Sequence, residues 1–376
     1  MNQSDKLSKL ISFWNRDKNN TKLTIDILTC YTQVQDIVGL SAFYQKLPES
    51  LMRNHDVQWT YAQCLLNCGE FSKAITTFQS LPDTSDHSKE YAIALCYFLQ
   101  GKVEDAHALL LNIVSPREND NIANEIFLLL AKVKYHLGML EEAQKIALNL
   151  SHRGMDNSSE LFGLLAMLAL DLTDIPASKK YAEQTLSIDD KHHDGLLALA
   201  SSELYRQNFG ECNKIASLGV KYYSRSGRMW SVLGQSQLVL QDADSAYLSL
   251  CNATVHMPEH IGTWHVKGWC ELTLNRVDDA YKSFKTALDL NRNFAESHGG
   301  LAVVSVSQGK HAEAAELVKK ALRLDPHCMS AKYAQSLLAE LQDNKEEAQT
   351  IIESILKQDS HISGISYQQL LQSLKK

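Results

Sequence analysis

The sequence is short of the residues that make turns. Its 376 residues include only 6 prolines and 17 glycines. β-Sandwiches, barrels and loop-rich enzymes need many more turn formers than this. The shortage therefore predicts helices joined by short polar turns, in a chain whose 44% hydrophobic and 22% charged content is that of an ordinary globular protein.

Other absences exclude whole classes of function. No apolar run approaches the roughly 18 residues that a membrane-spanning helix needs, and the polar start Met-Asn-Gln-Ser-Asp-Lys lacks the apolar core of a signal peptide. The formal charge of −7 argues against a nucleic-acid partner, because phosphate binding needs a basic surface. We expect neither a membrane span nor a nucleic-acid partner.

The eight cysteines contain no Cys-x-x-Cys pair, the basic spacing of zinc ribbons and thioredoxin-type sites. Cys64, Cys96 and Cys270 instead fall at one repeated position of the pattern described below, which favours a packing role. We interpret the cysteines as small apolar residues in a reduced compartment and predict a cytoplasmic location.

Catalytic and cofactor motifs are also missing. The chain has no Gly-x-Gly-x-x-Gly, no phosphate-binding Gly-x-x-x-x-Gly-Lys, no Gly-x-Ser-x-Gly and no His-Glu-x-x-His. His256, His260 and His265 lie near one another in sequence, but Pro258 between the first two prevents helical spacing. We predict that the protein is not an enzyme and has no catalytic residue, no cofactor and no metal site.

What the sequence does contain is a period of 34 residues. Trp230 and Gly234 recur one period later as Trp264 and Gly268. Small residues occupy the eighth position of every unit: Ala62, Ala94, Ala131, Ala166, Ala200, Gly234, Gly268, Ala302 and Ser336. They also occupy the twentieth: Ala74, Ala106, Ala143, Ser178, Cys212, Ala246, Ala280, Ala314 and Ala348. Two such columns indicate paired helices whose backbones approach closely.

This pattern resembles the tetratricopeptide repeat, in which Trp-x-x-Leu-Gly-x-x-Tyr is followed by Ala-x-x-x-Phe and a late Pro. The chain departs from it at Gln237 and Glu271, which stand where the family has Tyr. The resemblance implies an all-α, right-handed superhelical solenoid of antiparallel helix pairs with capping helices at both ends. We expect a bacterial source.

We divide the chain into nine repeat units preceded by one degenerate unit. The nine units are 55–86, 87–123, 124–158, 159–192, 193–226, 227–260, 261–294, 295–328 and 329–362, and the degenerate unit is 21–54. Apolar residues at helical spacing predict an N-terminal capping helix over 1–20 and a C-terminal one over 363–376. The N-terminal helix could instead bind a partner.

The turn inside each unit is marked by residues that tolerate a left-handed backbone. Glycine stands there in four units, at Gly69, Gly101, Gly138 and Gly309. Asn275 and Asp343 take the same place in two others. We predict a positive φ at these positions, where each first helix ends.

The resemblance implies a concave face lined by the first helix of each unit, with groove-facing side chains mainly at positions two, five, nine, twelve and thirteen. These offsets give the predicted partner-binding residues Trp59, Tyr91, Phe98, Leu128, Tyr135, Tyr205, Arg228, Gln235, His265, Trp269 and Tyr333. The family's basic carboxylate clamp is absent. Apolar residues at helical spacing also pack between repeats, so both interpretations stay open for each of them.

We predict a non-enzymatic scaffold or adaptor that binds a peptide, helix or hydrophobic segment of a partner protein in this groove. Two alternatives stay open. One is a bacterial secretion or assembly chaperone, and the other is a non-catalytic regulatory subunit of an enzyme complex. The sequence does not indicate an oligomeric state.

Overall fold

The computed structural model of the protein describes residues 3–83, 87–113, 121–155 and 157–356, together with His361–Ile362 and Ile365–Ser366. It divides into two compact bodies, Met1–Asp156 and Asn157–Lys376. We call them the N-terminal body and the C-terminal body. Each is described by itself.

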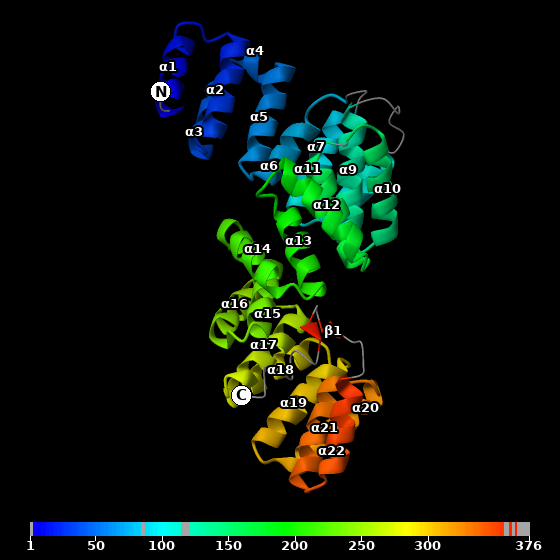
Figure 1. The fold of residues 1–376 in the computed structure, drawn as a ribbon. Helices are drawn as coiled ribbons and strands as arrows, with labels where there is room; N and C mark the ends of the chain where they lie inside the picture. The colour runs from blue at the N-terminus through cyan, green and yellow to red at the C-terminus, as the bar shows by residue number, and fades with distance from the viewer. Residues whose placement is uncertain are drawn as a thin grey trace. The chain divides into compact units, whose positions relative to one another are not determined.

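The N-terminal body contains a first helix, α1, followed by helix pairs (Figure 1). Its helices are α1 (Gln3–Trp14), α2 (Thr21–Gln33), α3 (Ile37–Tyr44), α4 (Glu49–Met52), α5 (His55–Asn67), α6 (Phe71–Gln79), α7 (Ser88–Leu99), α8 (Val103–Asn112), α9 (Asn121–His136) and α10 (Leu140–His152). Trp14 of α1 packs edge-on against Phe43 of α3 at 5.0 Å and donates a hydrogen bond from Nε1 to Thr24 Oγ1 at 3.2 Å. Helix α1 therefore covers the first helix pair of this body.

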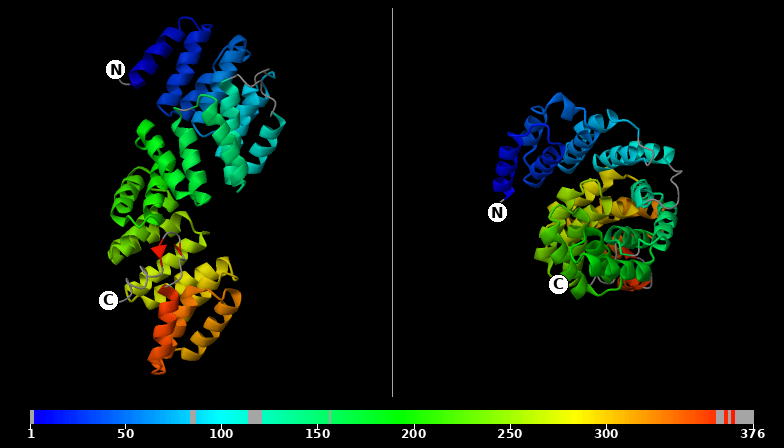
Figure 2. Two further views of the ribbon diagram at one scale, coloured as in Figure 1. Left: turned by 45° about the vertical axis from the view of Figure 1, so that its right-hand side comes forward. Right: turned by 90° about the horizontal axis from the view of Figure 1, so that it is seen from above.

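The C-terminal body continues the pattern of sequence-adjacent helices that pack in pairs, which Figure 2 shows from two further directions. Its helices are α11 (Ser159–Asp171), α12 (Ile175–Ile188), α13 (His193–Tyr205), α14 (Phe209–Tyr222), α15 (Gly227–Val239), α16 (Ala243–His256), α17 (Ile261–Thr273), α18 (Val277–Leu290), α19 (Ala295–Ser307), α20 (His311–Leu324), α21 (Met329–Leu341) and α22 (Lys345–Leu356). Each first helix also contacts the first helix of the next unit. The described chain is therefore all-helical up to α22, as the fold prediction states.

The predicted C-terminal helix is wrong where the structure describes the chain. Strands β1 (His361–Ile362) and β2 (Ile365–Ser366) pair antiparallel, with Ile362 opposite Ile365. β-Branched side chains favour extended backbone, which accounts for a strand at Ile365. Residues 363–364 and 367–376, the rest of the predicted helix, lie outside the described residues.

The two columns of small residues are buried throughout, from Ala62 and Ala74 to Ser336 and Ala348. At the eighth position of two units even a methyl group would not fit. A Cβ on Gly268 would come within 2.7 Å of the Phe284 ring, and one on Gly234 within 2.7 Å of Leu250 Cγ. The periodic small residue is therefore the point at which the two helices of a unit meet.

The turn prediction is confirmed at all six positions, and the structure adds others. Gly69, Gly101, Gly138 and Gly309 have φ values of 80°, 75°, 75° and 73°, and Asn275 and Asp343 have 57° and 59°. Side chains that rarely adopt this conformation take it in other units: Gln35, Thr173, Gln207 and Gln241. The tertiary pairing of the helices overrides local preference there, at a cost of roughly 1–2 kcal/mol for each residue.

Candidate functional site

The first helices of three successive units surround a pocket of about 480 Å³ in the C-terminal body. The pocket is lined by the end of α11, the end of α13 and the first half of α15, together with the turn before α17. Its lining residues are Leu170, Asp171, Thr173, Ser201, Leu204, Tyr205, Arg228, Ser231, Val232, Gln235, Met257 and His260.

The pocket follows from the repeat period. Positions two, five and nine of the unit 227–260 are Arg228, Ser231 and Gln235, and all three line it. Positions twelve and thirteen of the two preceding units supply its opposite wall: Leu170, Asp171, Leu204 and Tyr205. The five offsets therefore select one continuous surface on these helices.

An ion pair crosses this surface. Arg228 Nη2 lies 2.9 Å from Asp171 Oδ1 and donates a hydrogen bond to it, which joins α15 to α11 past the intervening unit. Both side chains stay partly accessible, at 44% and 29% exposed. Solvent screening makes such a pair worth about 0–1 kcal/mol to stability. Its main effect is on the charge of the pocket.

His260 forms the edge of the pocket next to α17. Its Nδ1 accepts the backbone N–H of Thr263 at 3.1 Å and so caps the N-terminus of that helix. Burial lowers the pKa of His260 from its ordinary value of 6.5, and the nearby Arg228 guanidinium lowers it further. The imidazole is therefore neutral at neutral pH.

Gln235 has a hydrogen-bonding group that no other described residue uses. Its side chain is only 3% exposed, and its Nε2 donates to Ser231 Oγ at 3.2 Å. Its Oε1 is buried and has no hydrogen-bond partner among the described residues. A buried polar atom left unpaired costs about 1–3 kcal/mol. A ligand that donates a hydrogen bond here would recover that cost.

The remaining wall combines an accessible aromatic ring with a strained turn. Tyr205, the last residue of α13, is 38% exposed and lines the pocket. Thr173 lines it as well and has φ = 62°, a conformation that is rare for a β-branched residue. Backbone strain of this kind persists only where the surrounding structure holds it in place.

Several predicted groove residues are buried, which corrects the prediction that they present themselves to a partner. Their small exposed fractions are those of core side chains: Leu128 5%, Gln235 3%, His265 0% and Trp269 1%. Trp269 Nε1 donates to His265 Nε2 at 3.0 Å, and its ring contacts those of Phe284 and Tyr333. Packing between repeats takes up these side chains. Gln235 differs from the other three because it lines the pocket.

The other predicted residues keep some accessible surface. Tyr205 and Arg228 are exposed, and five aromatic residues are half-buried: Trp59, Tyr91, Phe98, Tyr135 and Tyr333. Trp59 packs edge-on against Phe78 at 5.2 Å, and burial raises the pKa of Tyr91 to about 12. The structure therefore brings Tyr205, Arg228 and Gln235 together in one pocket. Trp59, Tyr91, Phe98 and Tyr135 belong to the N-terminal body.

Sequence reasoning missed the polar residues that complete the pocket, chiefly Asp171, Ser201, Ser231 and His260. Asp171, Ser201 and Ser231 stand at the predicted offsets, so the signal was present. The prediction kept only aromatic, apolar and long polar side chains at those offsets, so it left these three residues out. His260 ends its unit, and no repeat offset marks it as a pocket residue.

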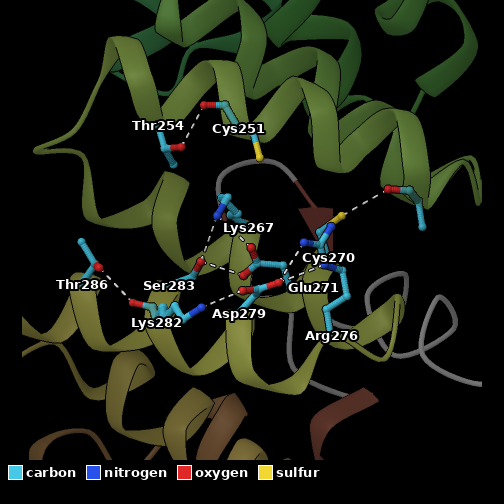
Figure 3. A network of polar contacts seen from close by, with 11 residues as sticks. Cys251, Thr254, Lys267, Cys270, Glu271, Arg276, Asp279, Lys282, Ser283 and Thr286 are labelled. Atoms are coloured by element: carbon cyan, nitrogen blue, oxygen red, sulfur yellow. Dashed lines mark hydrogen bonds and ion pairs between the residues drawn. The ribbon is translucent and has the colours of Figure 1, made fainter.

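The next helix pair contains a polar network that is structural (Figure 3). Glu271 of α17 is fully buried, and its two carboxylate oxygens accept hydrogen bonds from Lys267 Nζ at 2.8 Å and Ser283 Oγ at 2.6 Å. In the preceding unit Gln237 Oε1 accepts from Ser249 Oγ at 2.7 Å. These polar pairs stand where the repeat pattern has Tyr, so they replace that ring as the link between the two helices.

The described residues offer little of the chemistry of a metal or redox site. No group of three His, Cys, Asp or Glu side chains suited to a metal ion occurs in the described part of the chain. The cysteines are free, and burial raises the pKa of Cys96 to about 11 and of Cys212 and Cys270 to about 12. Among the described helices none is both long and apolar enough to span a membrane.

Comparison with known proteins finds the repeat in part of the chain. A family model described as tetratricopeptide repeat matches residues 266–327 and 306–360. Among solved structures, the crystal structure of the APC/C hetero-tetramer Cut9-Hcn1 is similar with a TM-score of 0.56 and 14% identity, over 98% of this chain and 81% of that chain. A likeness at this identity concerns the fold alone.

The similar curated proteins are much longer than the matched segments. Cellulose synthase 1 operon protein C of Komagataeibacter xylinus is 25% identical over 171 residues, which are 44% of this chain and 13% of that protein. Cellulose synthase operon protein C of Komagataeibacter sucrofermentans is 36% identical over 69 residues, which are 18% of this chain and 5% of that protein. The chain thus spans a small part of the relatives that it matches.

Proposed function

Because the chain carries tetratricopeptide repeats, we propose that it is a non-enzymatic interaction protein that binds an extended segment of a partner protein at the pocket of α11, α13 and α15. The observation that carries this proposal is the buried Oε1 of Gln235, which lacks a partner among the described residues and belongs to a side chain that lines the pocket. An extended peptide supplies hydrogen-bond donors at regular intervals and side chains for the pocket between them.

Tyr205 and Arg228 extend the contact. A partly exposed tyrosine ring is a low-entropy anchor for a bound chain, and a guanidinium on the rim can donate hydrogen bonds to carbonyl groups. We propose further contacts for the half-buried aromatic residues at the same offsets elsewhere: Trp59, Tyr91, Phe98 and Tyr135 in the N-terminal body and Tyr333 in the C-terminal body.

Selection from a displayed library of random peptides tests the proposal. Peptides selected on the full-length protein should bind the Gln235→Leu variant at least about tenfold more weakly, because one buried hydrogen bond is worth about 1.4 kcal/mol in binding. Gln349→Leu on α22, where Gln349 is exposed, makes the same chemical change away from the pocket and should not alter affinity. Equal affinity of both variants for every selected peptide would show that the pocket is not the binding site.

A second candidate is a non-catalytic subunit of an enzyme complex. The observation that favours it is the similarity to the cellulose synthase operon proteins C over part of the chain. Purification of the full-length protein from its own cells should then recover a catalytic chain, and disruption of the pocket by Tyr205→Glu should release it. A catalytic chain that is never recovered would count against this candidate.

The chaperone alternative depends on an aromatic and apolar groove, and the burial of Trp269 and Leu128 removes two of the side chains on which it was based. We therefore do not propose it. The cytoplasmic location stays a prediction that rests on the cysteine pattern.

A further inference from the structure

We propose that the pocket selects a carboxamide side chain, Asn or Gln, on the bound segment, and that the Asp171–Arg228 ion pair sets this selectivity by keeping the pocket electrically neutral. The inference rests on the proposed function and specifies the chemistry of the ligand at the same site.

The hydrogen-bonding groups at the floor of the pocket form a complementary pair. Gln235 Oε1 is an acceptor without a partner in the described part of the chain. Ser231 Oγ accepts from Gln235 Nε2 at 3.2 Å. Thr263 Oγ1 lies 3.4 Å from Ser231 Oγ and 2.8 Å from the acceptor His260 Nδ1, so the Ser231 hydroxyl has no short acceptor there and can turn its hydrogen to a ligand. One acceptor and one donor thus lie on neighbouring turns of α15. A carboxamide carries one group of each kind on a single planar unit.

The charges around the floor disfavour ionised ligands. Asp171 and Arg228 are the carboxylate and the guanidinium among the residues that line the pocket, and they are bonded to each other at 2.9 Å. A ligand carboxylate would compete with Asp171 for Arg228, and a ligand ammonium would compete with Arg228 for Asp171. Either ligand would lose its hydration without gaining a free counter-charge.

Apolar ligands are disfavoured for a different reason. A leucine side chain of similar size would cover Gln235 Oε1 and Ser231 Oγ without bonding to either. The pocket discriminates against it as a site built for hydrogen bonding discriminates against an analogue that lacks the bonding group.

The test is a matched series of peptides. The strongest binder that depends on Gln235 is resynthesised with Asn, Asp, Lys or Leu at the peptide position that enters the pocket. The affinity of each peptide for the full-length protein is measured by fluorescence anisotropy. The wild-type protein should bind the Asn peptide about tenfold or more tightly than the other three.

Single substitutions in the ion pair should then reverse the ranking. Asp171→Asn removes the carboxylate that is bonded to Arg228, so the Asp peptide should become the best ligand. Arg228→Gln removes the guanidinium that is bonded to Asp171, so the Lys peptide should become the best ligand. Asp289→Asn breaks an exposed ion pair with Lys285 on α18, outside the pocket, and should keep the wild-type ranking. Circular dichroism establishes that each variant is folded.

The possible outcomes separate the two proposals. A wild-type preference for the Asp, Lys or Leu peptide, or one ranking shared by the wild type and both ion-pair variants, would refute the carboxamide selectivity and leave the peptide-binding function standing. If no selected peptide depends on Gln235, the proposed function itself fails.

Discussion

Protonation of His265 should destabilise the C-terminal body in mildly acidic solution. The imidazole is fully buried, and its Nε2 accepts the Trp269 Nε1 hydrogen at 3.0 Å, so the neutral ring carries its proton on Nδ1. The rings of Phe284 and Phe294 lie 5.3 and 5.9 Å away. A second proton would turn Nε2 into a donor that faces the Trp269 donor, next to these two aromatic rings.

The size of the effect follows from the pKa. Burial lowers the pKa of His265 from 6.5 to about 4, although the Glu296 carboxylate at 3.9 Å acts in the opposite direction. The unfolded chain therefore binds the proton before the folded one does. The stability is fully present above about pH 6.5 and is lost as the pH falls towards about 4, with a loss of about 2 kcal/mol by about pH 5.

Urea unfolding at about pH 7.5 and about pH 5 measures this loss. Other histidines also titrate, so the informative quantity is the difference between the wild type and His265→Gln, whose amide stays neutral and can accept from Trp269. The variant should lose about 2 kcal/mol less than the wild type between the two pH values. Val318→Ala, a core deletion on α20, should lower stability at both pH values and keep the wild-type pH dependence. Equal pH dependence of the wild type and His265→Gln would refute the reasoning.

Three further substitutions test the packing. Gly268→Ala should destabilise the protein by about 1–3 kcal/mol, because its Cβ has no room against the Phe284 ring. Gly210→Ala on α14, with open space around it, should instead stabilise the protein by about 0.5–1 kcal/mol. Melting temperatures that both rise or both fall would contradict this. Thr173→Gly should raise stability in urea by about 0.5–1 kcal/mol, since relief of the positive φ exceeds the added chain entropy, and a loss would show that the turn is unstrained. Lys267→Met should lower the free energy of unfolding by about 3 kcal/mol, because the buried Glu271 carboxylate loses its cation. Adding Glu271→Gln should restore much of this stability. A double variant no more stable than Lys267→Met alone would disprove the pairing.

The helix pairs could be predicted from the sequence because their signal is local and repeated. A small residue at positions eight and twenty of each unit is needed wherever two helices touch, so it recurs as at Ala302 and Ala314. The same logic predicted left-handed turns at glycine, Asn275 and Asp343. It did not predict Thr173 or Gln241, where helix pairing imposes a conformation that the residue itself does not favour.

The candidate site could be predicted only in part, because the offsets recur and the side chains at them do not. The offsets identified Tyr205, Arg228 and Gln235. Exposure depends on neighbouring units: Trp269 is covered by Tyr333, two units further along the chain. The partner of Arg228 is separated from it by 57 positions, and no local pattern links them. The helix predicted over 363–376 is wrong at Ile365 and Ser366, because an amphipathic spacing over 367–374 was extended back to residue 363.

The Asp171–Arg228 contact changes how the C-terminal body should open. In a linear array each repeat is held only by its immediate neighbours, so an unfolding front can stop at any junction. A contact between the first and third of three units adds up to about 1 kcal/mol to the cost of separating the middle one. A peptide segment bound in the pocket would contact all three units and hold them together. Amide hydrogen exchange from α11 to α16 would then slow as one block on binding, by a factor set by ligand concentration over its dissociation constant.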